Sequence, residues 1–257
     1  MNNQSPTTNK PKSEPPELGS ENAFKQYLST HLSDLFTESS FEATTRGYEW
    51  ASKYLPPNKQ SLILDIGCGM GHFLSFLKNK EYINFTGVEI GPEQVNFIKQ
   101  HVTKHVILVE DTSQFLKEHP SKYDLITMFN MIEHLPKSKI PETLNAIHGA
   151  LKTGGRLIVV TGNIACFTSL FLRYIDFTHE VGFVETSLKQ VLKIAGFNKI
   201  EFVPDEIRLR AFTPRAILGW TVKHIHRLLL RLIYFVERPG VTRPKILAYT
   251  LKAIAEK

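Results

Sequence analysis

From residue 61 onward, short apolar runs alternate with helical stretches, and this alternation constrains the fold more than any other feature of the chain. The apolar runs that read as buried strands are Leu62–Ile66, Phe85–Val88, Val106–Val109, Leu125–Phe129 and Leu157–Thr161. The helical stretches between them are Gly71–Lys78, Pro92–His101, Gln114–Glu118 and Ile140–Leu151. Strands joined by crossover helices predict a mostly parallel, doubly wound α/β sheet of the Rossmann-like type.

The segments before this core have a different composition. Residues 1–20 are rich in Pro, Ser, Asn and Lys, which is typical of a disordered tail. Residues 21–57 are predicted to form N-terminal helices, at Glu21–Phe36 and Phe41–Tyr54, the second of which is stopped by two prolines.

The core domain is predicted to span residues 58–213, with a helical extension over 214–257. The elements expected after the fifth strand are helices at Ile164–Arg173 and Glu185–Ala195, strands at Ile200–Val203 and Arg208–Phe212, and a short helix from Lys245 to Ala255 that closes the chain. The two late strands are the ones we expect to complete the sheet.

Bulk composition limits the class of protein. A hydrophobic content of 42% and a charged content of 22% are ordinary for a soluble globular domain. The two cysteines, Cys68 and Cys166, give neither a disulfide framework nor a metal-ligand spacing, and we expect both to be small packing residues. The N-terminus lacks the apolar core of a signal peptide, so we predict a cytoplasmic protein.

A glycine-rich loop follows the first predicted strand and opens the first helix of the core. Glycines at Gly67, Gly69 and Gly71 allow positive φ and close approach of a ligand to the backbone. At the end of the next strand, twenty-two residues after Gly67, Glu89 offers two acceptors to ribose hydroxyls. The strand–turn–helix context favours a site for a nucleoside-bearing cofactor over a merely structural turn.

The loop also indicates which cofactor. A dinucleotide site prefers G-x-G-x-x-G, whereas this loop reads G-x-G-x-G and follows Asp65. A carboxylate at that position attracts the ammonium of an amino-acid moiety and would repel a pyrophosphate. The chemistry therefore favours S-adenosylmethionine (SAM), with an amino acid at one end and a ribose at the other.

Five segments in this order resemble the motifs of class I SAM-dependent methyltransferases. They are Leu64–Gly71, Val88–Ile90, Glu110–Thr112, Tyr123–Leu135 and Leu151–Leu157. The resemblance implies a seven-stranded sheet whose last strand is antiparallel. It also implies the following cofactor-binding residues: Asp65, Gly67, Cys68, Gly69, Gly71, Glu89, Ile90, Asp111, Thr112 and Asn130. Among these, Asp111 is implied to take the adenine amino group.

Two clusters compete as sources of a catalytic base, which a hydroxyl nucleophile requires. The first is the segment Asn130–His134 after the fourth strand, where His134 is a base, a contact to the substrate, or a residue that only shapes the pocket wall. The second is the loop over 173–188, where Asp176 and His179 are candidates or else belong to a segment that only anchors the next helix. This loop resembles a pattern found in methyltransferases of bacterial surface-polysaccharide synthesis. We predict no metal, because one histidine and two acids make a thin ligand set.

Basic residues gather near the C-terminus and account for the net charge of +6. Within 216–236 the cations Lys223, Arg227 and Arg231 recur every four residues along one side of a predicted helix whose other sides are crowded with apolar residues. Three central cations disfavour a membrane-spanning helix. A helix lying in the headgroup plane of a membrane is slightly favoured over one packed on the core or on a partner subunit. Nucleic acid is disfavoured, because the aromatic residues do not lie among the cations.

The leading hypothesis is a methyltransferase acting on a sugar hydroxyl of a glycan or glycolipid precursor near the inner membrane face. Alternatives are a quinone-like, lipid or small-metabolite hydroxyl as acceptor, and a regulatory protein that keeps the fold without the chemistry. A dinucleotide-dependent oxidoreductase is disfavoured by the glycine spacing and by Asp65.

Overall fold

The computed structural model describes residues 38–166, 168–204, 212–237 and 243–257. The predicted tail over 1–20 and the predicted helix Glu21–Phe36 lie outside these residues. The second predicted N-terminal helix is present, but in two parts. It begins as α2 (Glu38–Arg46) and continues from Gly47 as a 3-10 helix, η3 (Gly47–Tyr54).

A single seven-stranded sheet forms the centre of the molecule, in the order β3-β2-β1-β4-β5-β7-β6. The strands are β1 (Ile63–Ile66), β2 (Phe85–Glu89), β3 (Val106–Leu108), β4 (Tyr123–Phe129), β5 (Leu151–Gly162), β6 (Lys199–Phe202) and β7 (Thr250–Glu256). The pairings from β3 through β5 are parallel, whereas β7 pairs antiparallel with both β5 and β6. The predicted Rossmann-like sheet with an antiparallel last strand is confirmed.

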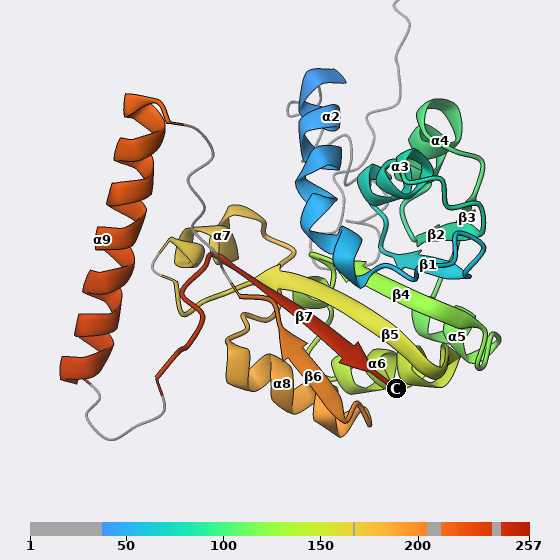
Figure 1. The fold of residues 1–257 in the computed structure, drawn as a ribbon. Coiled ribbons are helices and arrows are strands. Elements are labelled where there is room, and N and C mark those ends of the chain that lie inside the picture. The colour runs from blue at the N-terminus through green and yellow to red at the C-terminus, as the bar shows by residue number, and fades with distance from the viewer. Residues whose placement is uncertain (1–37, 167, 205–211, 238–242) are drawn as a thin grey trace, which may run out of the picture.

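Helices cover both faces of the sheet (Figure 1). They are α3 (His72–Asn79), α4 (Pro92–His101), α5 (Thr112–Lys117), α6 (Ile140–Ala150), α7 (Ser169–Ile175), α8 (Glu185–Ile194) and α9 (Pro214–Glu237), with a short 3-10 turn η4 (Ile132–His134) after β4. Because successive strand residues point to opposite faces, β1 sends Ile63 into the core under α3 and α4 and Leu64 into the core over α5, α6 and α8.

One prediction about the C-terminal part is wrong, and another lies mostly outside the described residues. The segment Lys245–Ala255, expected as a helix, instead contains β7, which lies between β5 and β6. The expected strand Arg208–Phe212 lies outside the described residues except for Phe212, which is not in a strand. The final strand of the sheet therefore comes from the segment predicted as a helical extension.

The long helix α9 stands at the edge of the molecule in Figure 1, on the far side of α7 from the strands. None of its residues is buried. Within the described residues, no helix combines the length and apolar character needed to cross a bilayer.

Candidate functional site

The carboxyl ends of β1, β2, β3 and β4 meet at one edge of the sheet, at the point where the strand order reverses between β1 and β4. Open α/β sheets bind ligands at this edge. The cofactor-binding residues predicted from the sequence lie at the carboxyl ends of these strands, in the loops that follow them or, for Thr112, at the first residue of α5.

The glycine loop after β1 has the backbone that its glycines were expected to allow. Gly67, Gly69 and Gly71 have φ of 64°, 54° and 77°. A Cβ on Gly67 would lie 2.7 Å from the Met131 side chain, whereas a Cβ on Gly69 would meet nothing within 4 Å. At Gly67 the loop therefore packs directly against Met131. At Gly69 it borders open space, which is available to a ligand and which a side chain would fill.

Glu89 holds this loop against the end of β2. Its Oε2 accepts a hydrogen bond of 2.8 Å from Gly69 N, and its Oε1 accepts one of 2.8 Å from Ile90 N. Burial raises the pKa of the Glu89 carboxyl, and the backbone donors oppose that shift. Cys68 is also buried, which raises the pKa of its thiol well above the ordinary value. Its position as a small packing residue agrees with the sequence interpretation.

Asp65 lies beneath the loop, near the end of β1, and is almost completely buried. It faces Thr127 of β4 in the sheet register, and its Oδ1 accepts a hydrogen bond of 2.6 Å from Thr127 Oγ1. Burial raises the pKa of Asp65 to about 7, with the Thr127 hydrogen bond lowering it and the charge of Glu89 raising it further. A carboxylate that burial disfavours in its ionised form is strongly stabilised by a cationic partner.

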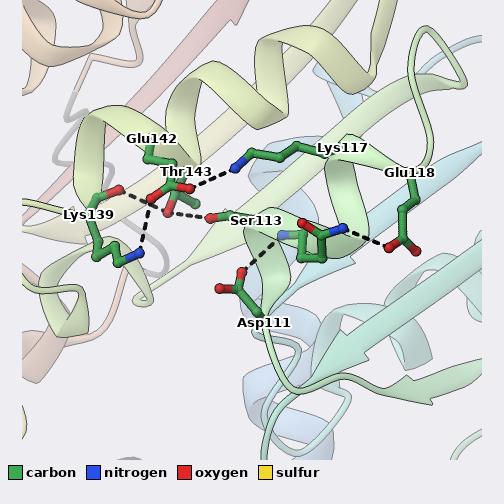
Figure 2. Close-up of polar contacts among 8 residues, drawn as sticks. Asp111, Ser113, Lys117, Glu118, Lys139, Glu142 and Thr143 are labelled. Carbon is green, nitrogen blue, oxygen red and sulfur yellow. Dashed lines mark hydrogen bonds and ion pairs between the residues drawn. The ribbon is translucent and has the colours of Figure 1, made fainter.

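Asp111 follows β3 and begins α5 (Figure 2). Its Oδ1 accepts a hydrogen bond of 2.9 Å from Gln114 N, which makes it the N-cap of that helix, while Thr112 is buried behind it. The helix is fixed to α6 by a buried hydrogen bond of 3.0 Å between Ser113 and Thr143. Asp111 is thus held at the sheet edge in an exposed position.

The two competing base candidates prove to be one cluster. His134, Asp176 and His179 each offer a ligating or proton-accepting atom, and these atoms all lie within 4.8 Å of one another. His134 comes from η4 after β4, while Asp176 and His179 come from the loop between α7 and α8. Within the described residues this is also the one group with the geometry for a metal ion, so the expected absence of metal stays a prediction.

Hydrogen bonds within the cluster orient the His134 ring. Thr178 Oγ1 donates to Asp176 Oδ1 at 2.7 Å, and His134 Nδ1 lies 2.8 Å from the same Thr178 oxygen. Since the threonine proton is directed at the carboxylate, the oxygen is left to accept from Nδ1–H. That tautomer leaves His134 Nε2 as the basic nitrogen.

Backbone hydrogen bonds hold the α7–α8 loop against η4. The amides of Glu180 and Val181 both donate to the Glu133 carbonyl, at 2.7 and 3.1 Å. The Glu133 side chain is buried next to this junction, and burial is the main cause that raises its pKa to about 7. Asn130, which precedes η4, is exposed, has a φ of 48° and donates its amide to Val160 O at 2.8 Å.

Two residues at the site were not predicted. Thr127 is a polar residue inside an apolar strand run, and that interruption was the available signal. Tyr48 of η3 lies with its ring centroid 4.9 Å from that of Phe129. Burial raises the pKa of Tyr48 above the ordinary range, and the charge of Asp65 adds to the shift. No local pattern indicates that the N-terminal segment folds over Asp65.

Comparison with known proteins gives a consistent picture. The family model described as "Methyltransferase domain" matches residues 36–201. Among curated proteins, the chain is similar to a ubiquinone biosynthesis O-methyltransferase of Aeromonas salmonicida, with 31% identity over 105 residues that cover 39% of this chain and 43% of the relative. The corresponding Erwinia tasmaniensis enzyme is 27% identical over 119 residues, covering 45% of this chain and 48% of the relative. The chain thus spans less than half the length of the curated relatives that it matches.

Solved structures resemble the whole fold. A SAM-dependent methyltransferase from Archaeoglobus fulgidus has a TM-score of 0.64 at 24% identity, covering 88% of this chain and all of that one. Phosphoethanolamine N-methyltransferase 2 of Haemonchus contortus, solved with S-adenosyl-L-methionine, has a TM-score of 0.55 at 16% identity, covering 91% of this chain and 60% of that one. At these identities the structures show a shared fold and leave the acceptor open.

Proposed function

The chain belongs to the methyltransferase domain family, and from this premise we propose that it transfers the methyl group of SAM to a ring hydroxyl of a quinone-like small molecule or lipid. The observation that carries the proposal is the His134 cluster, which presents a basic imidazole nitrogen at the same sheet edge as the glycine loop. A hydroxyl acceptor must lose its proton during methyl transfer and therefore needs a base nearby. An amine acceptor depends less on such a base.

The residues at the sheet edge fit the cofactor. SAM supplies a methyl group activated by a positively charged sulfur. We assign the buried Asp65 carboxylate to its ammonium, Glu89 to its ribose hydroxyls and Asp111 to its adenine amino group. The open side of Gly69 admits the ligand to the backbone. The remaining assigned positions follow the ends of the same strands: Gly67, Cys68 and Gly71 after β1, Ile90 after β2, Thr112 at the start of α5, and Asn130 after β4.

His134 is assigned as the general base. Its Nε2 takes the acceptor proton, and the resulting imidazolium is stabilised through Thr178 by the Asp176 carboxylate. The third member of the cluster, His179, packs against His134, with 4.6 Å between the two ring centroids. Tyr48 lies near enough to Asp65 for the carboxylate charge to raise its pKa, and its ring packs on that of Phe129, so we assign these two rings to excluding water from the site.

Two arguments support a ring hydroxyl over the sugar hydroxyl expected from the sequence. The curated relatives are named as ubiquinone biosynthesis O-methyltransferases. A phenolic hydroxyl titrates near pH 10, as tyrosine does, so an imidazole removes its proton more readily than that of an aliphatic hydroxyl.

The proposal is tested by incubating the purified full chain with SAM and two acceptor panels. One panel contains dihydroxylated aromatic rings with and without an isoprenoid tail, and the other contains sugars and sugar nucleotides. Formation of S-adenosylhomocysteine and of methylated product is followed by mass spectrometry. We expect ring O-methylation. Methylation of sugars alone would restore the first hypothesis, and binding of NADH without SAM would remove the methyltransferase assignment.

The variant His134→Gln distinguishes a role of His134 in catalysis from a role in SAM binding. We expect kcat to fall roughly 10²- to 10⁴-fold, the usual contribution of a general base. SAM affinity, measured by calorimetry, should stay unchanged. His105→Gln, at an exposed position just before β3, is the matched control and should behave as the wild type. An equal loss in both variants would show that His134 has no special role.

A further inference from the structure

The helix α9 presents a long apolar surface to solvent. It has 24 residues, none of them buried, and Leu228, Val236 and Leu218 are 67%, 66% and 65% exposed. We call the outward set of side chains the α9 apolar face: Leu218, Ile225, Leu228, Leu229, Leu232 and Val236. At 100° per residue these six lie within about 100° of one another on the helix. A continuous apolar strip of this kind indicates a partner.

The opposite side of α9 contacts the rest of the protein. Tyr234 OH donates a hydrogen bond of 3.1 Å to Ala165 O, in the loop after β5, and Tyr234 and Arg227 are only partly exposed. Lys223, Arg227 and Arg231 fall on this side of the helical wheel, within about 80° of one another. The α9 apolar face therefore points away from the sheet, with Lys223, Arg227 and Arg231 behind it and Arg215 at its border.

The charge of α9 distinguishes between possible partners. Its cations are Arg215, Lys223, Arg227 and Arg231, and its one acid is Glu237 at the very end. Two copies of a helix with a net charge of +3 repel each other when their apolar faces meet. Anionic lipid headgroups attract this net positive charge, and an apolar face on a helix whose polar side carries Lys and Arg is the pattern of a helix that lies in the membrane interface.

A second exposed apolar element adjoins α9. The Tyr234 hydrogen bond brings α9 to the loop that leads into α7. In and just after α7, Phe171, Tyr174 and Phe177 are 68%, 80% and 77% exposed. Aromatic side chains of this kind favour the headgroup level of a bilayer. Because α7 runs directly into Asp176 of the catalytic cluster, this surface adjoins the proposed acceptor site.

We infer that α9 docks on an anionic membrane surface, with the α9 apolar face inserted among the lipid headgroups and α7 beside it. The inference stands on exposure and charge and is independent of the identity of the acceptor. If a lipid-borne acceptor is methylated, the same surface brings the site to the bilayer from which that acceptor is drawn.

The test is vesicle flotation of the full chain. One vesicle preparation is pure phosphatidylcholine and the other contains phosphatidylglycerol at 40 mol % as the anionic lipid, a composition we choose to give a strongly negative surface. We expect at least tenfold stronger partitioning onto the anionic vesicles, and a decrease as salt concentration rises. Equal partitioning onto both vesicles, or none onto either, would overturn the inference.

Variants locate the contact. Leu228→Glu combined with Leu232→Glu should lower partitioning at least tenfold, because it places two charges in the α9 apolar face. The control is Gln190→Glu with Ile194→Glu on exposed positions of α8, which adds the same charge elsewhere. SAM affinity checks that both are folded. If the α9 variant instead dissociates a dimer that forms without lipid in sedimentation equilibrium, the partner is a second copy and the membrane inference fails.

Discussion

Asp65 combines two requirements that oppose each other. Its burial raises its pKa to about 7, so ionising it in the ligand-free protein is unfavourable. The sign follows from linkage: a carboxyl whose pKa is raised on folding contributes stability below its unfolded pKa, and this contribution is lost as the pH rises through 7. The same ionised carboxylate is the form that pairs with the ammonium of SAM. The ionised form of Asp65 thus lowers the stability of the ligand-free protein and raises its affinity for SAM.

We therefore expect SAM affinity to depend on pH through Asp65. Between pH 5.5 and 7.5 the dissociation constant should fall roughly tenfold, because the carboxylate becomes ionised over this interval. Calorimetric titration across the interval measures it. In Asp65→Asn the affinity should be weak and insensitive to pH, while the melting temperature of the ligand-free protein at pH 7.5 should rise by a few degrees. A pH-dependent Asn variant would assign the titration to another group.

Thr178 is a positioning residue between His134 and Asp176. Thr178→Val keeps the shape of the side chain and removes the hydroxyl that joins the two. We expect kcat to fall about tenfold to a hundredfold with little change in the KM for SAM, and the pH profile of kcat to shift because the imidazolium loses its link to the carboxylate. Thr178→Ser should restore much of the rate. If Ser and Val behave alike, the hydroxyl has no part in catalysis.

At the scale of elements, the contact between β2 and the glycine loop depends on Gly87. A Cβ at this position would lie 2.7 Å from both Cys68 Sγ and the Leu74 side chain. Gly87→Ala should therefore lower the free energy of unfolding by about 1–3 kcal/mol, as overpacking of a core does. It should also weaken SAM binding, since Cys68 belongs to the loop. Denaturant unfolding followed by circular dichroism, together with SAM titration, measures both effects.

Gly149 in α6 provides the matched control. It is exposed, has no positive φ, and a Cβ there would meet nothing within 4 Å. Gly149→Ala should raise the free energy of unfolding by about 0.5–1 kcal/mol, since alanine loses less backbone entropy on folding. Equal destabilisation by both alanines would show that steric contact at Gly87 is not the cause.

Elements whose hydrophobic residues recur with a clear period were predictable from the sequence. The strand runs from β1 to β5 and helix α4, which begins with Pro92 and ends at His101 as expected, follow from local pattern. The β7 segment was misread because its Ala, Lys and Glu residues favour a helix. In the sheet, β7 is enclosed between β5 and β6, and tertiary pairing outweighs that preference.

The candidate site was predictable where its residues follow strands directly. Asp65, Glu89 and His134 are close in sequence to strand ends, and parallel strands bring those ends together. The union of His134 with Asp176 depends instead on how a loop more than forty residues later folds back, which no local pattern encodes. Tyr48 reaches Asp65 in the same way, through packing of an N-terminal segment on α3 and β4.

At the scale of the whole molecule, the sheet is completed by β7, a strand that lies far along the sequence from the other six strands. Between β6 and β7 the chain leaves the sheet, forms α9 and returns. Asn163 secures the return, because its Nδ2 donates to the carbonyls of Ile246 and Ala248 at 2.9 and 2.8 Å. The insertion and the strand that follows it therefore have separate roles: β7 holds the sheet together, whereas α9 lies outside the core.

This separation predicts opposite outcomes for two deletions. Replacing residues 214–237 with a flexible Gly-Ser linker should leave the melting temperature within about 4 °C of the wild type, because the Tyr234 hydrogen bond contributes only about 1 kcal/mol. SAM affinity should be retained. Ending the chain at residue 249 removes β7, exposes the edges of β5 and β6 and deletes the buried Leu251, Ala253 and Ala255.

We expect the chain ended at residue 249 to lose its cooperative thermal transition and its SAM binding, because unpaired strand edges and lost apolar burial remove more than the marginal stability of a domain. Circular dichroism melting with and without SAM measures both variants. A cooperative, SAM-stabilised transition without β7 would show that β1 to β5 fold independently of the C-terminus. Loss of that transition without α9 would show that α9 belongs to the core, and its apolar face would then need an intramolecular explanation.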